Sequence, residues 1–356
     1  DECAVVVAGP GCGKSWRIGQ RVERLIDRDQ LQSAEIAVVS LTRSTVRDLQ
    51  RDIAHAEVST LHSFALRRLN ALGEAVRARV VDKWEQDNLI APDLCGLITE
   101  LHVTPSDVED FLKRLGAGFR ENQVAPPTLS PVEMSIRERW LFLRSFMQFR
   151  LFDELCFDLL RQLEGGAELA NPPRTILADE YQDLTPCELA LLRKMHDLHG
   201  TSILACGDDR QSIYGFREAD PLGLNNFCAV YELDYPIFLS ESRRCPQILC
   251  EFAEVVAGRL PPVPGLTQRP PLRAHPETAT GEIVVKSFPS PIRECRDTNT
   301  EIAQLIDAGV PASEVMVIVP SNIEMYLKML NDASGEAASN LVYYDTRSLN
   351  PVFDSR

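Results

Sequence analysis

The chain of 356 residues carries 52 acidic and 37 basic side chains, which gives it a formal net charge of −15. Its hydrophobic content of 44% is sufficient to build the cores of about two or three domains. No apolar run approaches the roughly 18 residues of a membrane span, and the sequence does not open on a secretory signal. Its ten cysteines form no C-x-x-C pair, which argues against a zinc ribbon and a secreted disulfide framework. We therefore expect a cytoplasmic protein without a membrane partner.

The first predicted strand, at 4–8, runs into the glycine-rich turn of AVVVAGPGCGKS. Glycines let backbone N–H groups turn inward around phosphate oxygens, and the following helix directs its positive end at them. Lys14 is then placed to reach the β- and γ-phosphates of ATP, and the Ser15 hydroxyl to bind Mg²⁺. The glycines that would hold the nucleotide are Gly9, Gly11 and Gly13. The alternative is a strand-to-helix turn that binds no nucleotide.

Further apolar runs at 36–40, 175–178 and 202–206 alternate with helical stretches at 45–54 and 186–197. Short, partly β-branched strands separated by helices are typical of a parallel sheet covered by helices. The sequence therefore predicts an α/β fold.

The stretch 72–150 carries no motif and interrupts this alternation with a helical pattern. We interpret it as a helical subdomain inserted into the α/β fold. Its aromatic residues are expected to form the core of the insertion rather than a binding stripe: Trp140, Phe146, Phe149 and Phe152.

Paired acids follow the strand at 175–178 in the sequence TILADEYQD. Asp179 is placed to hold Mg²⁺ through a water, and Glu180 to orient and deprotonate an attacking water. A phosphate loop needs such a metal anchor and base at the end of a nearby strand, so the two motifs support each other. An isolated Asp-Glu pair after a strand is more often a solvated turn or a charge pair at a helix N-terminus.

The run ILACGDDRQSIYGFREAD, at 203–220, places polar residues and then two aromatic residues after a strand. It predicts a nucleotide sensor followed by a surface on which nucleic-acid bases stack. The negative net charge opposes nucleic-acid binding in general, but binding of one strand needs only a local basic groove. Basic clusters occur at 43–51 and 67–68, although such clusters are more often solvated helix faces.

Six blocks of the sequence resemble, in order, the motifs of superfamily 1A helicases of the UvrD, PcrA and Rep kind. The blocks are AGPGCGKS (8–15), VVSLTRSTVRDL (38–49), VSTLHSF (58–64), ILADEYQDL (176–184), ACGDDRQSIYGFREA (205–219) and LSESRRCPQIL (239–249). The resemblance implies RecA-like P-loop NTPase lobes with parallel sheets and an inserted helical subdomain. It also implies a hydrolase that uses ATP and Mg²⁺ to move 3′→5′ on single-stranded DNA or a 3′-tailed duplex.

The same resemblance assigns roles to individual residues of these blocks. Gln211 resembles the γ-phosphate sensor, and Arg244 resembles an arginine finger contributed by the second lobe. Tyr214 and Phe216 resemble the aromatic residues on which bases stack. The further strand contacts that it indicates are Thr42, Thr60, His62 and Arg217. Taken alone, His62 and Phe216 would each be interpreted as packing residues.

The sequence also departs from the family pattern at several positions. Leu41 stands where the family usually has Phe, so one stacking platform is lost, and Arg43 is placed to compensate through a phosphate contact. Arg243 stands where a tyrosine commonly stacks on adenine, and its guanidinium plane could stack there instead. Arg210 replaces a usual Asp and Glu218 a usual Gly, neither with an explanation in the sequence. No glutamine motif for adenine recognition precedes the phosphate loop.

A second α/β unit is expected from about residue 225 onward. Strand-like runs at 236–239, 282–288 and 315–319 alternate there with helical stretches. Between them, the proline-rich stretch 259–281 is expected to be an exposed connector.

The predicted organisation therefore has three parts. Residues 1–71 and 151–224 form the first RecA-like lobe, residues 72–150 the helical insertion, and residues 225–356 part of a second lobe. The family's last two motifs, which carry a second arginine and a strand grip, are not found after residue 250. We therefore expect the chain to be incomplete as a motor, and to need a missing C-terminal segment or a protein partner for unwinding.

Two other classes of function remain open. One is a nucleotide-gated single-strand-binding or regulatory module without unwinding activity. The other is a P-loop enzyme that modifies a small substrate, although it leaves the DEYQD and QSIYGFR runs unexplained. Stimulation of ATP hydrolysis by single strands would separate the helicase and the nucleotide-gated module from the small-substrate enzyme.

Overall fold

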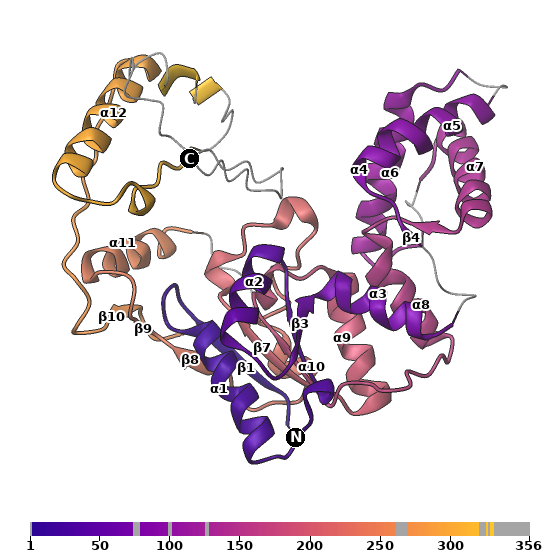
Figure 1. Ribbon diagram of the computed structural model, residues 1–356, viewed down its shortest axis with the longest axis horizontal. Coiled ribbons are helices and arrows are strands. Elements are labelled where there is room, and N and C mark those ends of the chain that lie inside the picture. Colours follow the sequence, from indigo (N-terminus) through magenta and orange to yellow (C-terminus); the bar gives the residue numbers. More distant parts are fainter. Residues whose placement is uncertain are drawn as a thin grey trace. The chain divides into compact units, whose positions relative to one another are not determined.

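The computed structural model describes residues 2–73, 79–98, 102–124, 128–260, 269–319, 325–326 and 328–330. The chain divides into two compact units, residues 1–282 and 283–356, which are considered separately below (Figure 1). Among the described residues, no helix is both long and apolar enough to cross a membrane.

The first unit is built on a six-stranded sheet in which every neighbouring pair is parallel. In spatial order the strands are β3 (Glu57–Thr60), β2 (Ile36–Ser40), β6 (Thr175–Ala178), β7 (Ser202–Gly207), β1 (Ala4–Ala8) and β8 (Ile237–Leu239). The α/β fold predicted from the sequence is confirmed. The run at 236–239, expected to open the second α/β unit, instead supplies the edge strand β8 beside β1.

Helices cover both faces of this sheet because successive strand residues point to opposite sides. On one face, Val38 and Leu177 join the apolar cluster under α1 (Lys14–Asp27) and α2 (Arg43–Asp52). On the other face, Val39 joins a larger cluster. The helices packed in that cluster are α3 (Leu61–Ala71), α8 (Glu154–Glu164) and α9 (Pro186–His199).

The helical insertion lies between α3 and α8 and shares their apolar cluster. Its elements are β4 (Arg79–Val80), α4 (Lys83–Glu85), a π-helical turn (Gln86–Ile90), α5 (Ala91–Leu97), α6 (Pro105–Arg120), α7 (Pro131–Met147) and β5 (Phe149–Arg150). Trp140 and Phe149 are buried and meet edge to face with ring centroids 5.0 Å apart, as predicted. The prediction is wrong for Phe146 and Phe152, which are exposed because they fall on the outer face of α7 and in the loop before α8.

Beyond α10 (Phe227–Val230) and β8, the first unit continues through β9 (Glu241–Ser242), α11 (Gln247–Ala257) and β10 (Arg273–Ala274). The second unit contains α12 (Pro291–Asp307). The strands predicted at 282–288 and 315–319 are not present, although both runs lie within the described residues. Val285 and Ile318 are exposed there, and a strand-like run without a paired neighbour is not stable as a strand.

Candidate functional site

All the motifs that the sequence singles out follow the carboxyl ends of strands in the main sheet. The phosphate loop follows β1, the acid pair follows β6, and the run containing Gln211 follows β7. Because β6, β7 and β1 are adjacent and parallel, these three loops meet at one edge of the sheet. In open α/β sheets this edge is where ligands bind.

The phosphate loop has the backbone that its glycines were expected to provide. Gly11 and Gly13 have φ values of 72° and 84°, and Gly13 is the N-cap of α1. A Cβ added at Gly11 would lie 2.6 Å from the Cβ of Arg244, so a side chain cannot fit there. The backbone N–H of Arg243 also donates to the Gly11 carbonyl at 3.0 Å. The structure thus brings Arg243 and Arg244, both exposed, beside the phosphate loop.

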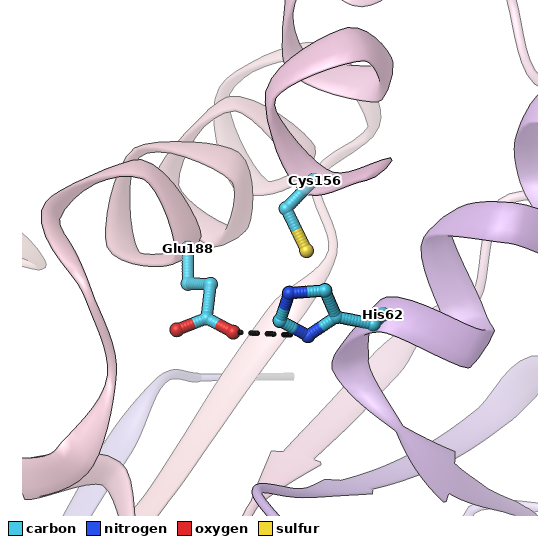
Figure 2. A group of neighbouring side chains, drawn as sticks. All are labelled: His62, Cys156 and Glu188. Carbon is cyan, nitrogen blue, oxygen red and sulfur yellow. Dashed lines mark ion pairs between the residues drawn. The ribbon is translucent and has the colours of Figure 1, made fainter. Parts of the chain in front are cut away.

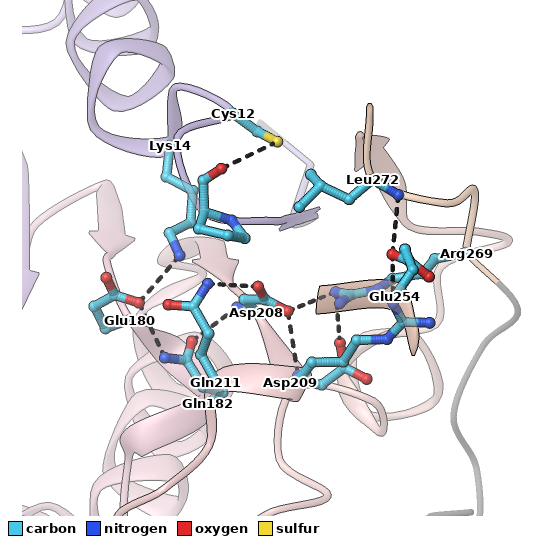
Figure 3. Close-up of polar contacts among 12 residues, drawn as sticks. Cys12, Lys14, Glu180, Gln182, Asp208, Asp209, Gln211, Glu254, Arg269 and Leu272 are labelled. Atoms are coloured by element: carbon cyan, nitrogen blue, oxygen red, sulfur yellow. Dashed lines mark hydrogen bonds and ion pairs between the residues drawn. The ribbon is translucent and has the colours of Figure 1, made fainter. Parts of the chain in front are cut away.

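Lys14 reaches across the sheet edge to the acid pair (Figure 3). Its Nζ lies 3.3 Å from Oε2 of Glu180, and the same oxygen accepts a hydrogen bond from Nε2 of Gln182 at 2.9 Å. Glu180 has a left-handed backbone, with φ 49° and ψ 45°. That conformation is costly for a residue other than glycine and is frequent at functional sites. Ser15, which follows Lys14 at the start of α1, is exposed.

Burial perturbs two carboxyl groups of the acid loop. It raises the pKa of Asp179 to about 6, and the negative charge of Glu180 adds to the rise while Lys14 opposes it. Asp183 has a pKa of about 6 for the same two reasons, burial first and Glu180 second. A buried carboxyl group with a raised pKa is difficult to ionise, and the charge of a bound divalent cation would stabilise its ionised form. Asp179 and the Ser15 hydroxyl therefore suit Mg²⁺ chemically.

Gln211 lies in a short 3₁₀ turn (Asp209–Gln211) directly after β7. Its Nε2 donates to Oδ2 of Asp208 at 2.6 Å, and Asp208 is buried. The backbone N–H of Asp208 donates in turn to Oε1 of Gln182 at 2.9 Å. Gln211 is therefore joined through Asp208 and Gln182 to the carboxylate of Glu180.

The aromatic residues of the same run are presented to solvent. Phe216 is 75% exposed and Ile213 is 71% exposed. The rings of Tyr214 and Phe216 are inclined to each other with centroids 5.7 Å apart, and the guanidinium of Arg217 lies 5.8 Å from the Tyr214 ring centroid. The exposed Phe216 ring, the partly buried Tyr214 ring and the neighbouring cation are together suited to stacking on nucleic-acid bases.

An open pocket of about 370 Å³ connects the two sets of residues. Its lining includes Glu180 and Gln211 from the nucleotide side, and Thr42 and Tyr214 from the proposed strand side. Glu180 and Gln211 thus border the same hollow as two of the proposed strand contacts, Thr42 and Tyr214.

Thr42 and Thr60 occupy equivalent places at the starts of two helices. Each is an N-cap whose hydroxyl accepts from the backbone N–H three residues later, at 3.1 Å in both cases: Thr45 for Thr42 and Ser63 for Thr60. Arg43, the first residue of α2, is exposed. The N-termini of α2 and α3 therefore direct helix dipoles outward, and Arg43 adds a positive charge at the first of them.

His62 has a more enclosed position than the other proposed strand contacts (Figure 2). Its side chain is 12% exposed, its ring stacks on Phe152 at 4.2 Å, and its Nδ1 lies 3.5 Å from Oε1 of Glu188. Burial lowers the pKa of His62, so the ring is neutral at pH 7. In this structure its contacts are those of a packing residue.

His62, Cys156 and Glu188 form a group of possible metal ligands among the described residues. Glu188 and Cys156 approach different edges of the imidazole ring (Figure 2). Burial raises the pKa of the Cys156 thiol well above its usual range, which disfavours the thiolate that a metal requires. Glu188 is also occupied by the capping box of α9, where its Oε2 accepts from the backbone and hydroxyl of Thr185. The arrangement is explained by packing and helix capping.

Arg210 and Glu218, unexplained by the sequence, both form ion pairs with distant elements. Arg210 lies 2.7 Å from Glu254 of α11, and Glu218 lies 2.6 Å from Arg120 of α6. Arg120 also pairs with Asp153 at 2.6 Å. The two substitutions thus tie the run after β7 to α11 on one side and to the helical insertion on the other.

The geometry agrees with what comparison with protein families finds. The family model of the UvrD/REP helicase N-terminal domain matches residues 1–232. The chain belongs to this family. Its main sheet, with the phosphate loop after β1 and helices on both faces, is the RecA-like α/β fold of these helicases.

Several helicases of this kind are similar to the chain over most of its length. The ATP-dependent DNA helicase Srs2 of Schizosaccharomyces pombe is 24% identical over 70% of the chain and 32% of its own length. UvrD2 of Mycobacterium tuberculosis is 24% identical over 92% of the chain and 51% of its own length. PcrA of Staphylococcus aureus is 23% identical over 71% and 37%, respectively. The chain thus spans about a third to a half of these relatives.

Proposed function

We propose that the chain is the ATP-binding part of a DNA helicase or translocase that moves 3′→5′ on single-stranded DNA. The observation that carries this proposal is the continuous run after β7. Within it, Gln211 is hydrogen-bonded into the phosphate-loop network, while Phe216 is exposed beside Tyr214. A change at the nucleotide can therefore reach the base-stacking residues through a few peptide bonds.

Lys14 and Glu180 are proposed to exchange partners when ATP binds. In the present structure the ammonium group pairs with the carboxylate at 3.3 Å. A triphosphate carries more negative charge and would attract Lys14 away from Glu180. The freed carboxylate, still held by the amide of Gln182, could then accept a proton from an attacking water. Glu180 would thus act as a base only in the presence of nucleotide.

Ser15 and Asp179 are the residues proposed to hold Mg²⁺, Asp179 through a water. When bound, the ion neutralises charge that develops on the β- and γ-phosphates. The neighbouring Arg243 and Arg244 are proposed to contact the nucleotide, with Arg244 stabilising transition-state charge. Their support is the close packing of their backbone against Gly11.

The proposed track of the strand crosses the starts of α2 and α3. Thr42, Arg43 and Thr60 would contact phosphates, while Tyr214 and Phe216 would stack on bases and Arg217 would add charge. His62 would support this surface by its packing under Phe152. Contacts of this kind read the backbone and the base faces, so binding would depend little on sequence.

The organisation into lobes also remains a proposal. Residues 1–71 and 151–224 would form the nucleotide-binding lobe, with 72–150 as its insertion and 225–356 as part of a second lobe. The pairing of β8 with β1 favours one change to these bounds, because it would place the passage between the lobes after Leu239 rather than at residue 225. All ten cysteines are free, which supports a reducing compartment such as the cytoplasm.

The test is ATP hydrolysis by the chain, measured with and without single-stranded DNA and with duplexes carrying a 3′ or a 5′ tail. We expect single strands to stimulate hydrolysis, and any strand separation to require the 3′ tail. Hydrolysis that ignores single strands would contradict the proposal. Strand-stimulated hydrolysis without movement along the strand would instead favour the nucleotide-gated binding module.

A further inference from the structure

Arg269 belongs to the proline-rich stretch that the sequence presents as an exposed connector, yet it is one of the most enclosed arginines near the site. Its side chain is only 12% exposed. Its Nη1 donates to Oδ1 of Asp208 at 2.5 Å and to Oδ1 of Asp209 at 3.1 Å (Figure 3). The expectation of an exposed connector is therefore wrong at Arg269.

Asp208 stands between Arg269 and the nucleotide pocket. One carboxylate oxygen accepts from Arg269 and, at 3.2 Å, from the backbone N–H of Arg210, and the other accepts from Nε2 of Gln211 at 2.6 Å. Both oxygens are thus fixed, by a cation on one side and by the proposed γ-phosphate sensor on the other. The backbone N–H of Asp208 is also fixed, by Gln182, which holds Glu180.

The charge balance explains why an arginine is needed here. The side chains of Asp208 and Asp209 are 1% and 4% exposed, so two carboxylates are removed from water beside a site for a polyanionic nucleotide. A buried carboxylate without a partner is costly and would also repel the triphosphate. Arg269 compensates both groups at once, because one nitrogen of its guanidinium reaches an oxygen of each.

The hydrogen-bond inventory of Gln211 adds a directional argument. Its amide nitrogen carries two hydrogens, and Asp208 accepts one of them. The second hydrogen is then left in a fixed direction and can donate to a phosphate oxygen. If Asp208 lost its cation and moved, the amide of Gln211 would be free to rotate.

The backbone next to Arg269 is anchored to neighbouring elements. The N–H of Leu272 donates to Oε1 of Glu254 on α11 at 2.9 Å, and the N–H of Arg273 donates to the Ser240 carbonyl at 2.8 Å. A Cβ added at Gly9 of the phosphate loop would lie 2.8 Å from Leu272. The segment that carries Arg269 is therefore packed against the phosphate loop.

We propose that Arg269 is a positioning residue of the nucleotide site, which holds Asp208 so that Gln211 distinguishes ATP from ADP. The inference rests on the proposed function, because it takes Gln211 as the γ-phosphate sensor. Arg269 acts through Asp208 and does not itself contact the nucleotide.

The experiment compares dissociation constants for ADP·Mg²⁺ and for a non-hydrolysable ATP analogue with Mg²⁺, by fluorescent-nucleotide competition on the full chain. The unmodified chain should prefer the analogue. Arg269→Met should reduce this preference by about tenfold, the value of one hydrogen bond to a charged group, and change ADP affinity little. The matched control is Arg273→Met, which removes an exposed cation from the same segment and should leave the preference unchanged.

A double variant separates positioning from general damage. If Arg269 acts through Gln211, the pair Arg269→Met with Gln211→Ala should lose no more preference than Gln211→Ala alone. Losses that multiply would overturn the inference, and so would an unchanged preference in Arg269→Met. Should Arg269→Met unfold, Arg269→Gln removes the charge and keeps a polar side chain, and a full preference in that folded variant would equally overturn the inference.

The outcome also distinguishes this inference from the function on which it rests. An unmodified chain that binds neither nucleotide contradicts the proposed function itself. An unmodified chain that prefers the ATP analogue, with no change in Arg269→Met, contradicts only the role of Arg269.

Discussion

The two halves of the run after β7 differ sharply in their surroundings. In the first half, Asp208 is buried and Gln211 is hydrogen-bonded to it. In the second half, Ile213 and Phe216 are more than two-thirds exposed, with values of 71% and 75%. The phosphate sensor proposed for Gln211 must be fixed in direction, whereas the base-stacking surface proposed for Tyr214 and Phe216 must be open. One short segment meets both needs because its first half is enclosed by neighbouring loops and its second half extends past them.

The largest expected effects come from Lys14 and Glu180, which are joined to the enclosed half through Gln182. Lys14→Ala should weaken binding of ATP·Mg²⁺, whereas Glu180→Gln should keep binding and slow hydrolysis by about 10²–10⁴-fold, the usual contribution of a general base. Binding should survive because the glutamine no longer competes with phosphate for Lys14. Nucleotide titration and a hydrolysis assay measure both variants, with the exposed lysine variant Lys113→Ala as control. Equal loss of nucleotide affinity in both variants would contradict the role of Glu180.

The next effect concerns the open half. Phe216→Ala should weaken single-strand binding by about 1–3 kcal/mol with little dependence on base sequence. The free energy of unfolding should change by no more than about 0.5 kcal/mol, because the ring is exposed. Ile213→Ala is the matched control, since it shortens an equally exposed side chain that has no π face. If Phe216→Ala kept its affinity but lost stability, the ring would be a packing residue.

A smaller effect tests, through pH, the burial of the acid loop after β6, whose Asp183 lines the same pocket as Gln211. Since the pKa of Asp183 is raised to about 6 from the ordinary 3.8, the folded state binds its proton more readily than the unfolded state. This carboxyl group should therefore reduce stability as pH rises from about 4 to about 6, and no further above that range. Between these two pH values, the free energy of unfolding of Asp183→Asn should rise by about 1 kcal/mol relative to that of the unmodified chain. This value is smaller than the full pKa shift would give, because water screens part of the interaction. Denaturant unfolding at pH 4.5 and 7 would detect it, and a difference independent of pH would contradict it.

The smallest effect lies where the open half meets the helical insertion. A double-mutant cycle with Arg120→Met and Glu218→Gln should give a coupling free energy of about 0.2–1 kcal/mol, because both side chains are about one-quarter exposed. The coupling should appear in unfolding stability and leave nucleotide affinity unchanged. A zero coupling would show that the run is held at this end by its backbone alone.

The sequence predicted those parts of the structure that depend on local pattern. The strands at 4–8, 36–40, 175–178 and 202–206 form as expected, and the phosphate loop has the backbone that its glycines indicate. Contacts between distant positions could not be predicted in this way. Arg269 and Asp208 are 61 positions apart, and no periodicity or turn signal relates them.

Burial on a helix was also only partly predictable. The aromatic residues of the insertion are all hydrophobic, so hydrophobicity alone does not show which of them are buried. Helix α7 buries Trp140 and exposes Phe146, because only one of its faces meets the neighbouring helices. The runs at 282–288 and 315–319 illustrate the opposite limit. Their β-branched residues favour strands, but a strand is stable only when a neighbour supplies its hydrogen bonds.

The left-handed backbone of Glu180 has a consequence for how this protein can change. At φ 49° a glycine or asparagine would be held at lower conformational cost than a glutamate. Variants selected only for thermal resistance should therefore tend to lose the acidic group at this position, whereas variants selected for turnover should retain it. With Glu180 as the proposed base, resistance to heat and speed of hydrolysis would be opposed at a single residue.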